Sequence, residues 1–360
     1  MSWNQKSNFL LLPKERYPTQ RSMLREFLLR EFSPKCKSLS WIMQSQSSKF
    51  GMHYFHFNNS EFKVIPKIGN SFFDIIINFI FKFIISFGTI RSKKCSAIIV
   101  HDGPLEGIIG LFYRSFFNLK MIYIITAPLW EFESQNNKIK YSLFNFHKLL
   151  KSFIFKRLYK IVIDRADVLH PISDSMSSRF LGKANASKVF CLPESASSYF
   201  LSKYSPKKVD ESKSKNLIYI GSLGKLRNLD FLIRSFSYAF KRDNSLSLYL
   251  IGWSEESGDK EKLISLSKEL EIQNSVFFKD RVPYSLLPRT IKDSLLGLSP
   301  IPPTSFYKIS TPTKVLDYMS LGIPVLCNSE IDDQHFLVSN SGCGSSVKYD
   351  VNVFAKEILA

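Results

Sequence analysis

The sequence has few of the features that mark secreted or metal-binding proteins. Its 360 residues contain five cysteines, an odd number, and these are scattered without any Cys-x-x-Cys or Cys–His pairing. Disulfides and cysteine-bound metals are therefore not expected, and the thiols are predicted to be buried in a reducing compartment. A signal-peptide pattern is also missing, because the short apolar run Phe9–Leu12 leads directly into charged residues. We therefore expect a cytoplasmic protein.

A long uninterrupted apolar run is lacking as well. The longest one extends from Ile75 to Ile90, and Asn78 and Lys82 break it. It is shorter than the roughly 20 residues that a membrane-spanning helix needs, and it carries a charge near its middle. The pattern predicts a buried helix of a globular domain.

Acidic residues are scarce in the first half of the chain. Residues 1–195 contain 28 Lys and Arg against 13 Asp and Glu, a net charge of +15, whereas residues 196–360 contain 21 against 18, a net charge of +3. This asymmetry favours an anionic partner for the first half: an acidic lipid surface, a pyrophosphate-linked acceptor or nucleic acid. A solvated surface without a partner remains the alternative. We expect no nucleic acid, because neither a recognition helix nor an aromatic-and-basic patch is found.

Predicted strands and helices alternate along the chain, and the alternation runs twice. The first run occupies residues 1–198, a polar and charged linker is predicted over 199–215, and the second run occupies residues 216–360. Alternation of this kind predicts an α/β fold with two Rossmann-like parallel-sheet domains. The carboxyl ends of the strands in both sheets are expected to face one cleft, where open α/β sheets bind their ligands.

One predicted helix of the first half, over residues 142–163, is basic and amphipathic. Apolar residues such as Phe153 and Leu158 are expected on one side, and the cations on the other are Lys148, Lys151, Lys156 and Arg157. Together with the charge asymmetry, this helix predicts docking on an anionic membrane surface.

The most specific pattern covers residues 299–328. Pro312 suits the first turn of a helix, Ser310 or Thr311 suits its cap, and Gly322 suits its end. The free backbone N–H groups of such a helix start, with Lys314 in the first turn, are suited to hold a phosphate or another anion.

The residues Ser310-Thr-Pro-Thr-Lys-Val-Leu-Asp-Tyr-Met-Ser-Leu-Gly-Ile-Pro-Val resemble the donor-site signature of the family-4 retaining glycosyltransferases, the glycogen-synthase-like group with the GT-B fold. The resemblance implies that Asp317 holds the ribose hydroxyls of a nucleotide-sugar. It also implies that Lys314 and the residues Ser310, Thr311 and Pro312 contact the sugar or the phosphates. The family often has a second acid eight positions earlier, where this chain has Ile309.

Two further segments of the second half are similar to donor-domain motifs of the same family. Residues 219–233 look like its first strand, glycine-rich turn and helix, which implies a diphosphate contact at Gly221, Ser222 and Arg227. Many members carry an arginine where this chain has Ser222, so Lys225 is the candidate to replace that charge. Residues 276–284 resemble a later strand, whose end, at Arg281 and Val282, is implied to bind the nucleobase.

The first half resembles the family less closely. Residues 165–176 and 192–194 match two of its short segments, but a histidine usual after the strand at 121–126 is absent. The candidates on the acceptor side are Arg21, His101, Asp102 and Glu131. The resemblance also implies helices that cross back to the first domain, and we expect the chain, which stops at Ala360, to lack them.

The resemblance implies a hexosyltransferase that moves a sugar from a nucleotide-diphospho-sugar to a glycan or lipid-linked acceptor with retention of configuration. Polysaccharide or glycoconjugate biosynthesis is the expected setting, at the inner face of the membrane if the basic half docks there. No metal or other cofactor is expected, because Asp332-Asp333 is not placed as a metal-binding acidic pair. The alternatives are a sugar-nucleotide epimerase of the same fold, which would act without an acceptor, and a basic binding module without catalysis.

Overall fold

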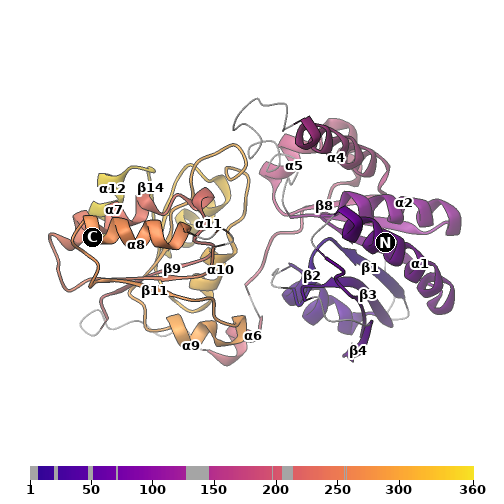
Figure 1. Cartoon of the computed structure of the whole chain (residues 1–360), viewed down its shortest axis with the longest axis horizontal. Helices are drawn as coiled ribbons and strands as arrows, with labels where there is room; N and C mark the ends of the chain where they lie inside the picture. Colours follow the sequence, from indigo (N-terminus) through magenta and orange to yellow (C-terminus); the bar gives the residue numbers. More distant parts are fainter. Residues whose placement is uncertain are drawn as a thin grey trace. The chain divides into compact units, whose positions relative to one another are not determined.

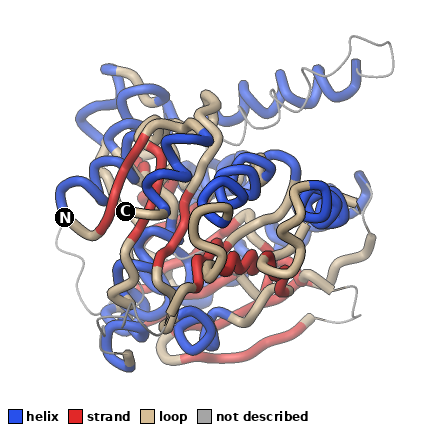
Figure 2. Tube along the Cα trace, turned by 90° about the vertical axis from the view of Figure 1, so that its left-hand side faces the viewer, coloured by secondary structure: helices blue, strands red, loops and turns tan. Residues whose placement is uncertain are grey.

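The computed structural model describes residues 7–19, 23–47, 52–69, 72–126, 146–196, 198–204, 214–254, 256 and 258–360. The chain divides into two compact units, Met1–Glu194 and Ser195–Ala360, here called unit 1 and unit 2 (Figure 1). Strands form one sheet in each unit, and helices connect them (Figure 2).

Unit 1 contains a largely parallel sheet whose strands run in the order β4-β5-β3-β1-β6-β7-β8, with β2 beside β3. The pair β4–β5 is antiparallel, and the other pairs are parallel. The strands are β1 (Asn8–Pro13), β2 (Arg16–Tyr17), β3 (Ser38–Ser45), β4 (His53–Phe57), β5 (Ser60–Ile65), β6 (Ala97–His101), β7 (Lys120–Ile125) and β8 (Val168–Pro171). The central strands β1 and β6 are buried along almost their whole length, as is usual for parallel strands covered on both faces.

Three long helices of unit 1 share one face of this sheet. They are α1 (Phe72–Lys93), α2 (Pro104–Phe117) and α4 (Phe146–Arg165), which lead to β6, β7 and β8. The three connections that contain these helices all run toward β8 along the sheet. Because such crossovers are right-handed, the helices lie on the same face, and α2 packs against both α1 and α4. The helix η1 (Met23–Phe32) belongs to the connection from β1 to β3, which runs in the opposite direction along the sheet. A right-handed connection in that direction places η1 on the opposite face. Shorter helical segments are η2 (Ser33–Lys35), α5 (Asp174–Phe180) and η4 (Lys183–Lys188).

Unit 2 has a fully parallel sheet in the order β11-β10-β9-β12-β13-β14. Its strands are β9 (Asn216–Ile220), β10 (Ser247–Ile251), β11 (Val276–Lys279), β12 (Leu296–Ser299), β13 (Val325–Asn328) and β14 (Gly344–Val347). Its helices are α6 (Ser198–Lys203), η5 (Lys225–Arg227), α7 (Asp230–Phe240), α8 (Asp259–Glu269), η6 (Tyr284–Leu286), α9 (Leu287–Ile291), α10 (Thr313–Ser320), α11 (Asp332–Ser341) and α12 (Val351–Ile358). In chain order the sheet reads 3-2-1-4-5-6, the dinucleotide-binding arrangement, so the strand order reverses between β9 and β12.

The core of unit 2 lies on both faces of this sheet. One cluster joins α7, α8 and α12 to the strands, and in it Phe231 stacks on Tyr349 with ring centroids 3.9 Å apart. The other cluster joins α9 and α10 to the opposite face and contains the buried rings of Phe200 and Tyr318.

The first residues of the expected linker are helical instead. Residues Ser198–Lys203 form α6, whose Phe200 is fully buried and stacks on Tyr284 at 4.5 Å between ring centroids. Burial of this ring fixes a segment whose overall composition is polar. Residues 205–213 of the same segment lie outside the described residues.

Two predicted helices of unit 1 differ from expectation in what they expose. Helix α1 is not buried on all sides, since Phe73 is 71% exposed and Ile84 is 61% exposed; by length and composition it could cross a membrane. In the described part of α4, Phe153 and Ile154 are exposed beside Lys156 and Arg157, and the Arg157 guanidinium lies 5.1 Å from the Phe153 ring. The predicted division of this helix into an apolar and a basic side is therefore wrong there.

The five cysteines all lie in the described part of the chain, and none of them forms a disulfide there. Cys36, Cys95 and Cys327 are buried, and burial raises the pKa of each thiol to about 11. Cys191 and Cys343, one in each unit, are partly exposed.

Candidate active site

The point where strand order reverses in unit 2 brings two loops together, one after β9 and one after β12. The loop after β9 begins at Gly221, whose φ of 149° few other residues adopt. The Gly221 N–H donates to the Ile251 carbonyl at 3.0 Å, and a Cβ on Gly252 would lie 1.7 Å from the Gly221 oxygen. These contacts hold the loop against the end of β10.

The loop after β12 leads into α10, which begins differently from the prediction. Pro312 is the N-cap, and within the described structure no side chain caps the helix. The hydroxyls expected to do so bond elsewhere: Ser310 Oγ donates to the Tyr307 carbonyl at 2.7 Å, and Thr311 Oγ1 donates to Asp333 Oδ2. The two hydroxyls therefore brace the loop.

Tyr318 ties α10 to the sheet. Its hydroxyl accepts from the Ile220 N–H at 3.0 Å and donates to the Ile218 carbonyl at 3.3 Å, and a Cβ on Gly297 of β12 would lie 2.5 Å from its ring. Because Tyr318 is fully buried, these contacts fix the position of α10 against the end of β9.

Lys314, in the first turn of α10, carries a buried amine. Within the described structure its Nζ has no hydrogen-bond partner and lies 3.9 Å from the centroid of the Tyr219 ring. Burial, together with the nearby positive charge of Arg227, holds the pKa of the Lys314 amine well below its usual value. The Arg227 guanidinium, from the loop after β9, lies 4.7 Å from the Tyr307 ring centroid. Two basic side chains therefore converge at the switch point, and the amine of one has no hydrogen-bond partner in the described structure, an arrangement suited to a dianionic group.

Asp317 lies one turn further along α10 and is 8% exposed. Its Oδ1 accepts a hydrogen bond from the Tyr284 hydroxyl at 2.6 Å. The Tyr284 ring in turn stacks on the ring of Phe200. After β11, Val282 packs against the same apolar cluster, whereas the Arg281 guanidinium lies 4.4 Å from the Trp253 ring centroid. The residues expected to contact ribose and base thus belong to neighbouring segments of unit 2.

Two of the expected donor residues make contacts within their own loop. Lys225 is exposed, and its backbone N–H donates to Asp259 Oδ2 at 3.0 Å. Ser222 Oγ accepts from the Gly224 N–H at 3.1 Å, and the Ser222 carbonyl accepts from the Tyr219 hydroxyl at 3.0 Å. At this turn the basic side chain that lies beside Arg227 is that of Lys314.

The acceptor-side candidates in unit 1 are either buried or outside the described residues. His101 ends β6, Asp102 follows it, and both are almost completely buried. The two Asp102 carboxylate oxygens accept from the backbone N–H and the hydroxyl of Thr126, and the Asp102 carbonyl accepts from the Tyr159 hydroxyl at 2.7 Å. These bonds join β6, β7 and α4, so Asp102 has a structural role in this arrangement. Arg21 and Glu131 lie outside the described residues.

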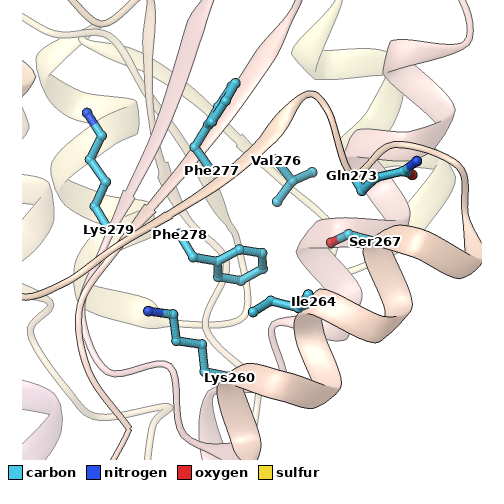
Figure 3. A pocket seen from close by; sticks show the side chains of 8 residues that line it. All are labelled: Lys260, Ile264, Ser267, Gln273, Val276, Phe277, Phe278 and Lys279. Atoms are coloured by element: carbon cyan, nitrogen blue, oxygen red, sulfur yellow. The ribbon is translucent and has the colours of Figure 1, made fainter.

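A hollow of about 510 Å³ lies elsewhere in unit 2, between α8 and the edge strand β11 (Figure 3). Lys260 and Lys279 stand at one end of it, and Ile264, Phe278 and Val276 form its floor. None of the sequence-predicted site residues lines this hollow, so it is separate from the site at the switch point.

Sequence reasoning missed the aromatic residues of the site. Tyr219 and Tyr307 lie beneath the two cations, and Tyr284 bonds Asp317. Tyr219 could have been noticed in the sequence, because it lies two residues before Gly221 of the glycine-rich turn. Tyr307 lies in a loop without a repeating pattern, so nothing in the sequence marked it.

Comparison with known proteins agrees with this geometry. Residues 202–358 match the family model described as glycosyl transferases group 1. No curated protein matches the sequence.

Among solved structures, sucrose-phosphate synthase from Thermosynechococcus elongatus has a TM-score of 0.74 at 13% identity, over 98% of this chain and 89% of that one. HepE from Anabaena, in complex with UDP and glucose, has a TM-score of 0.69 at 12% identity, over 98% and 89%. A UDP-forming α,α-trehalose-phosphate synthase from Burkholderia xenovorans has a TM-score of 0.66 at 10% identity, over 98% and 91%. Residues 202–358 therefore resemble a domain of the glycosyl transferases group 1, and the chain has the GT-B fold, as the sequence predicted.

Proposed function

We propose that this protein is a hexosyltransferase that transfers a sugar from a nucleotide-diphospho-sugar to a glycan or lipid-linked acceptor. The observation that carries the proposal is the unpaired, buried amine of Lys314 beside Arg227 at the switch point of unit 2. A diphosphate placed there would supply the negative charge that this pair lacks.

Five of the predicted donor residues have a role in this proposal. Arg227 and Lys314 bind the diphosphate, and Asp317, held by Tyr284, accepts hydrogen bonds from the ribose hydroxyls. The backbone after β11, at Arg281 and Val282, borders the nucleobase. As the bond between the sugar and the diphosphate breaks, negative charge grows on the leaving group, and two fixed cations stabilise that charge without having to move.

The donor is proposed to be a UDP-sugar. Two of the similar structures are described as bound to UDP or as UDP-forming. Retention of configuration and independence from a metal ion are proposals that rest on the resemblance of residues 310–325 to family-4 enzymes. The first half of the chain contains 28 cationic and 13 acidic residues. This net positive charge favours an acceptor that carries negative charge, such as a pyrophosphate-linked lipid.

The test combines donor binding with turnover. Thermal shift with a panel of UDP-, GDP- and dTDP-sugars identifies the donor, because a ligand that binds the folded state raises its stability by RT ln(1 + [L]/Kd). With that donor, Arg227→Ala is expected to lower turnover on the order of 10²-fold. Asp317→Ala is expected mainly to raise the donor Kd.

The matched control is Arg234→Ala, which removes an exposed arginine from α7, away from both loops. It should retain donor binding and turnover. Normal activity of both Arg227→Ala and Asp317→Ala would remove the assigned site. Conversion of a sugar nucleotide into its epimer without any acceptor would replace the transferase by the epimerase alternative.

A further inference from the structure

Helix α1 of unit 1 presents an apolar stripe to the outside. Phe73, Ile80, Ile84 and Phe87 recur at intervals of seven, four and three residues, which places them along one side of the helix. Their exposed fractions range from 39% for Phe87 to 71% for Phe73. Large apolar side chains in such a row, uncovered in the described structure, are unusual for the surface of a globular protein.

Helix α2 extends the stripe into a broader surface. Phe112 and Phe116 are 47% and 64% exposed and stack on each other at 5.8 Å between ring centroids. The ring of Phe112 also packs on Phe83 of α1 at 5.0 Å, and Phe87 packs on Phe117 at 5.8 Å. Since ring contacts join the two helices, the four residues of the stripe together with Phe112 and Phe116 form one continuous apolar face.

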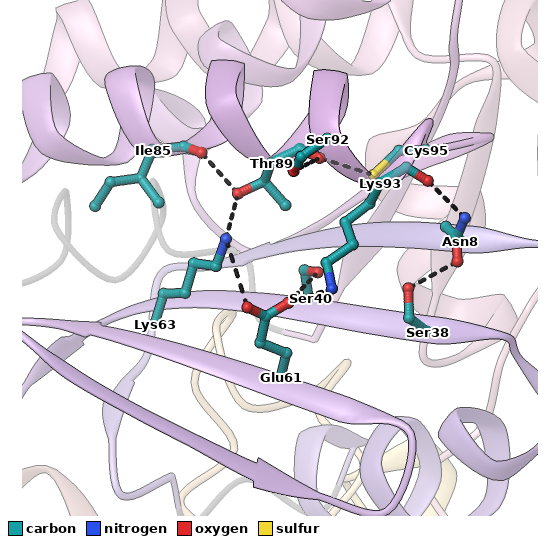
Figure 4. Close-up of polar contacts among 10 residues, drawn as sticks. All are labelled: Asn8, Ser38, Ser40, Glu61, Lys63, Ile85, Thr89, Ser92, Lys93 and Cys95. Atoms are coloured by element: carbon teal, nitrogen blue, oxygen red, sulfur yellow. Dashed lines mark hydrogen bonds and ion pairs between the residues drawn. The ribbon is translucent and has the colours of Figure 1, made fainter.

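The opposite side of α1 is fastened to the sheet by polar contacts. Thr89 Oγ1 accepts from Lys63 Nζ at 2.9 Å, Lys93 Nζ pairs with Glu61 at 3.3 Å, and the Lys93 carbonyl accepts from Asn8 Nδ2 at 2.6 Å (Figure 4). Near the middle of the helix, the buried Lys82 Nζ donates to Glu106 Oε1 at 2.6 Å and to the Pro13 carbonyl at 2.9 Å.

These contacts decide how the helix can meet a membrane. A spanning α1 would have to break all of them and place Lys82 in hydrocarbon, which is costly. The folded unit instead presents only the outer side of α1, so the geometry suits a helix that lies in the plane of the membrane interface.

The charge around the apolar face selects the kind of surface that would cover it. The acidic residues of α1 and α2, Asp74 and Glu106, are both buried. Two exposed cations lie at the C-terminal end of α1 and form the rim of the face there: Arg91, over the Phe87 ring at 5.7 Å, and Lys94, one residue beyond the helix. An apolar face with a cationic rim is complementary to an anionic bilayer, whereas a second copy of the same face would bring like charges together.

We propose that the apolar face of α1 and α2 inserts into the interface of an anionic lipid bilayer and that the cations at its rim contact the lipid headgroups. The site differs from the basic helix over 142–163 that the sequence favoured, because insertion of apolar side chains contributes as well as charge. The proposal is independent of the transferase reaction and needs neither donor nor acceptor.

The experiment measures flotation of the full chain with vesicles of phosphatidylcholine alone or with 30% phosphatidylglycerol. The wild type is expected to float with the anionic vesicles, and to do so less at 0.5 M NaCl because salt screens the headgroup contacts. Ile84→Gln/Phe116→Gln should lower the bound fraction at least about tenfold, since two inserted side chains lose their apolar burial. Both positions are exposed, so the melting temperature should stay unchanged.

The matched control is Leu201→Gln/Phe336→Gln, which changes two side chains of similar exposure, 56% and 65%, in unit 2. It should float like the wild type. Equal flotation of Ile84→Gln/Phe116→Gln and the wild type would overturn the proposal, as would no flotation with either vesicle. A lipid-free dimer that the same double substitution dissociates in sedimentation experiments would also overturn it, by assigning the face to a second copy.

Discussion

At the scale of single residues, the Lys314 amine couples anion binding to pH. Its pKa is well below the usual value in the free protein, and a bound diphosphate would favour the protonated form and raise that pKa. Between the two values, binding of UDP should therefore take up a proton, and affinity should fall as pH rises. Below the lower value the amine is already charged, so affinity should be constant.

Calorimetric titration of UDP in two buffers of different ionisation enthalpy at pH 8.5 measures this uptake. Lys314→Met should bind UDP more weakly and take up fewer protons. The same group affects folding: because the unfolded chain holds this proton more tightly, the free energy of unfolding should rise with pH between the lowered pKa of the folded protein and the ordinary lysine pKa of the unfolded chain. Identical proton uptake by Lys314→Met would contradict the assignment of the amine to the diphosphate.

Gly221 is a second residue at which a small change should have a large effect. A Cβ there would lie 3.0 Å from the Tyr219 hydroxyl and 3.3 Å from Lys314 Nζ, in a backbone conformation that alanine avoids. Gly221→Ala should lower the free energy of unfolding by about 1–3 kcal/mol and also weaken UDP binding.

The control for Gly221→Ala is Gly182→Ala in unit 1. Gly182 also has a positive φ, 63°, but a Cβ there would have nothing within 4 Å. Denaturant titration should show a loss of stability in both variants, and only Gly221→Ala should change the UDP Kd. A normal Kd in Gly221→Ala would mean that the diphosphate does not approach this turn.

At the scale of elements, the site depends on how α10 is fixed to the sheet. Tyr318→Phe removes both hydroxyl contacts with β9 and leaves the Ile220 N–H without its partner. We expect a loss of about 1–3 kcal/mol in the free energy of unfolding. Because α10 carries Lys314 and Asp317, the UDP Kd should rise as well.

Tyr238→Phe is the control for this change, since Tyr238 is 43% exposed on α7. Urea unfolding and UDP titration of the two variants, side by side with the wild type, make the comparison. Should Tyr318→Phe lose stability and keep the wild-type Kd, the hydroxyl would stabilise the fold without positioning the site.

Elements with a clear period and clear ends could be predicted from the sequence. The elements α2, β9, α7 and β10 are of this kind, because each has a regular apolar pattern that ends at Gly, Asn or charged residues. The hairpin β4–β5 was missed, although Asn58, with a φ of 51°, lies in an Asn-Asn turn that could have indicated it. The exposed side of α1 could not be predicted, since an apolar residue carries no sign of whether another element covers it.

At the scale of the whole molecule, the two-sheet α/β architecture followed from the order of strands and helices, and the cationic part of the site from the resemblance of short segments. The pairing of Arg227 with Lys314 followed from the resemblance and not from any local pattern, because residues almost ninety positions apart meet only when β9 and β12 lie side by side. The acceptor side was harder still. The burial of His101 and Asp102 depends on contacts with β7 and α4 that leave no local pattern.

The distribution of buried and partly exposed thiols would allow each unit to be labelled with a dye without any mutation. Cys191 lies in unit 1 and Cys343 in unit 2, whereas the other three thiols are buried and, with a pKa of about 11, almost entirely protonated at neutral pH. A maleimide dye should therefore modify two thiols quickly and the other three only on unfolding. Mass spectrometry of the intact protein counts the modified thiols. Rapid modification of Cys36, Cys95 or Cys327 would contradict this prediction. The unmutated protein would then report, by energy transfer between its two dyes, whether the units move when a nucleotide binds.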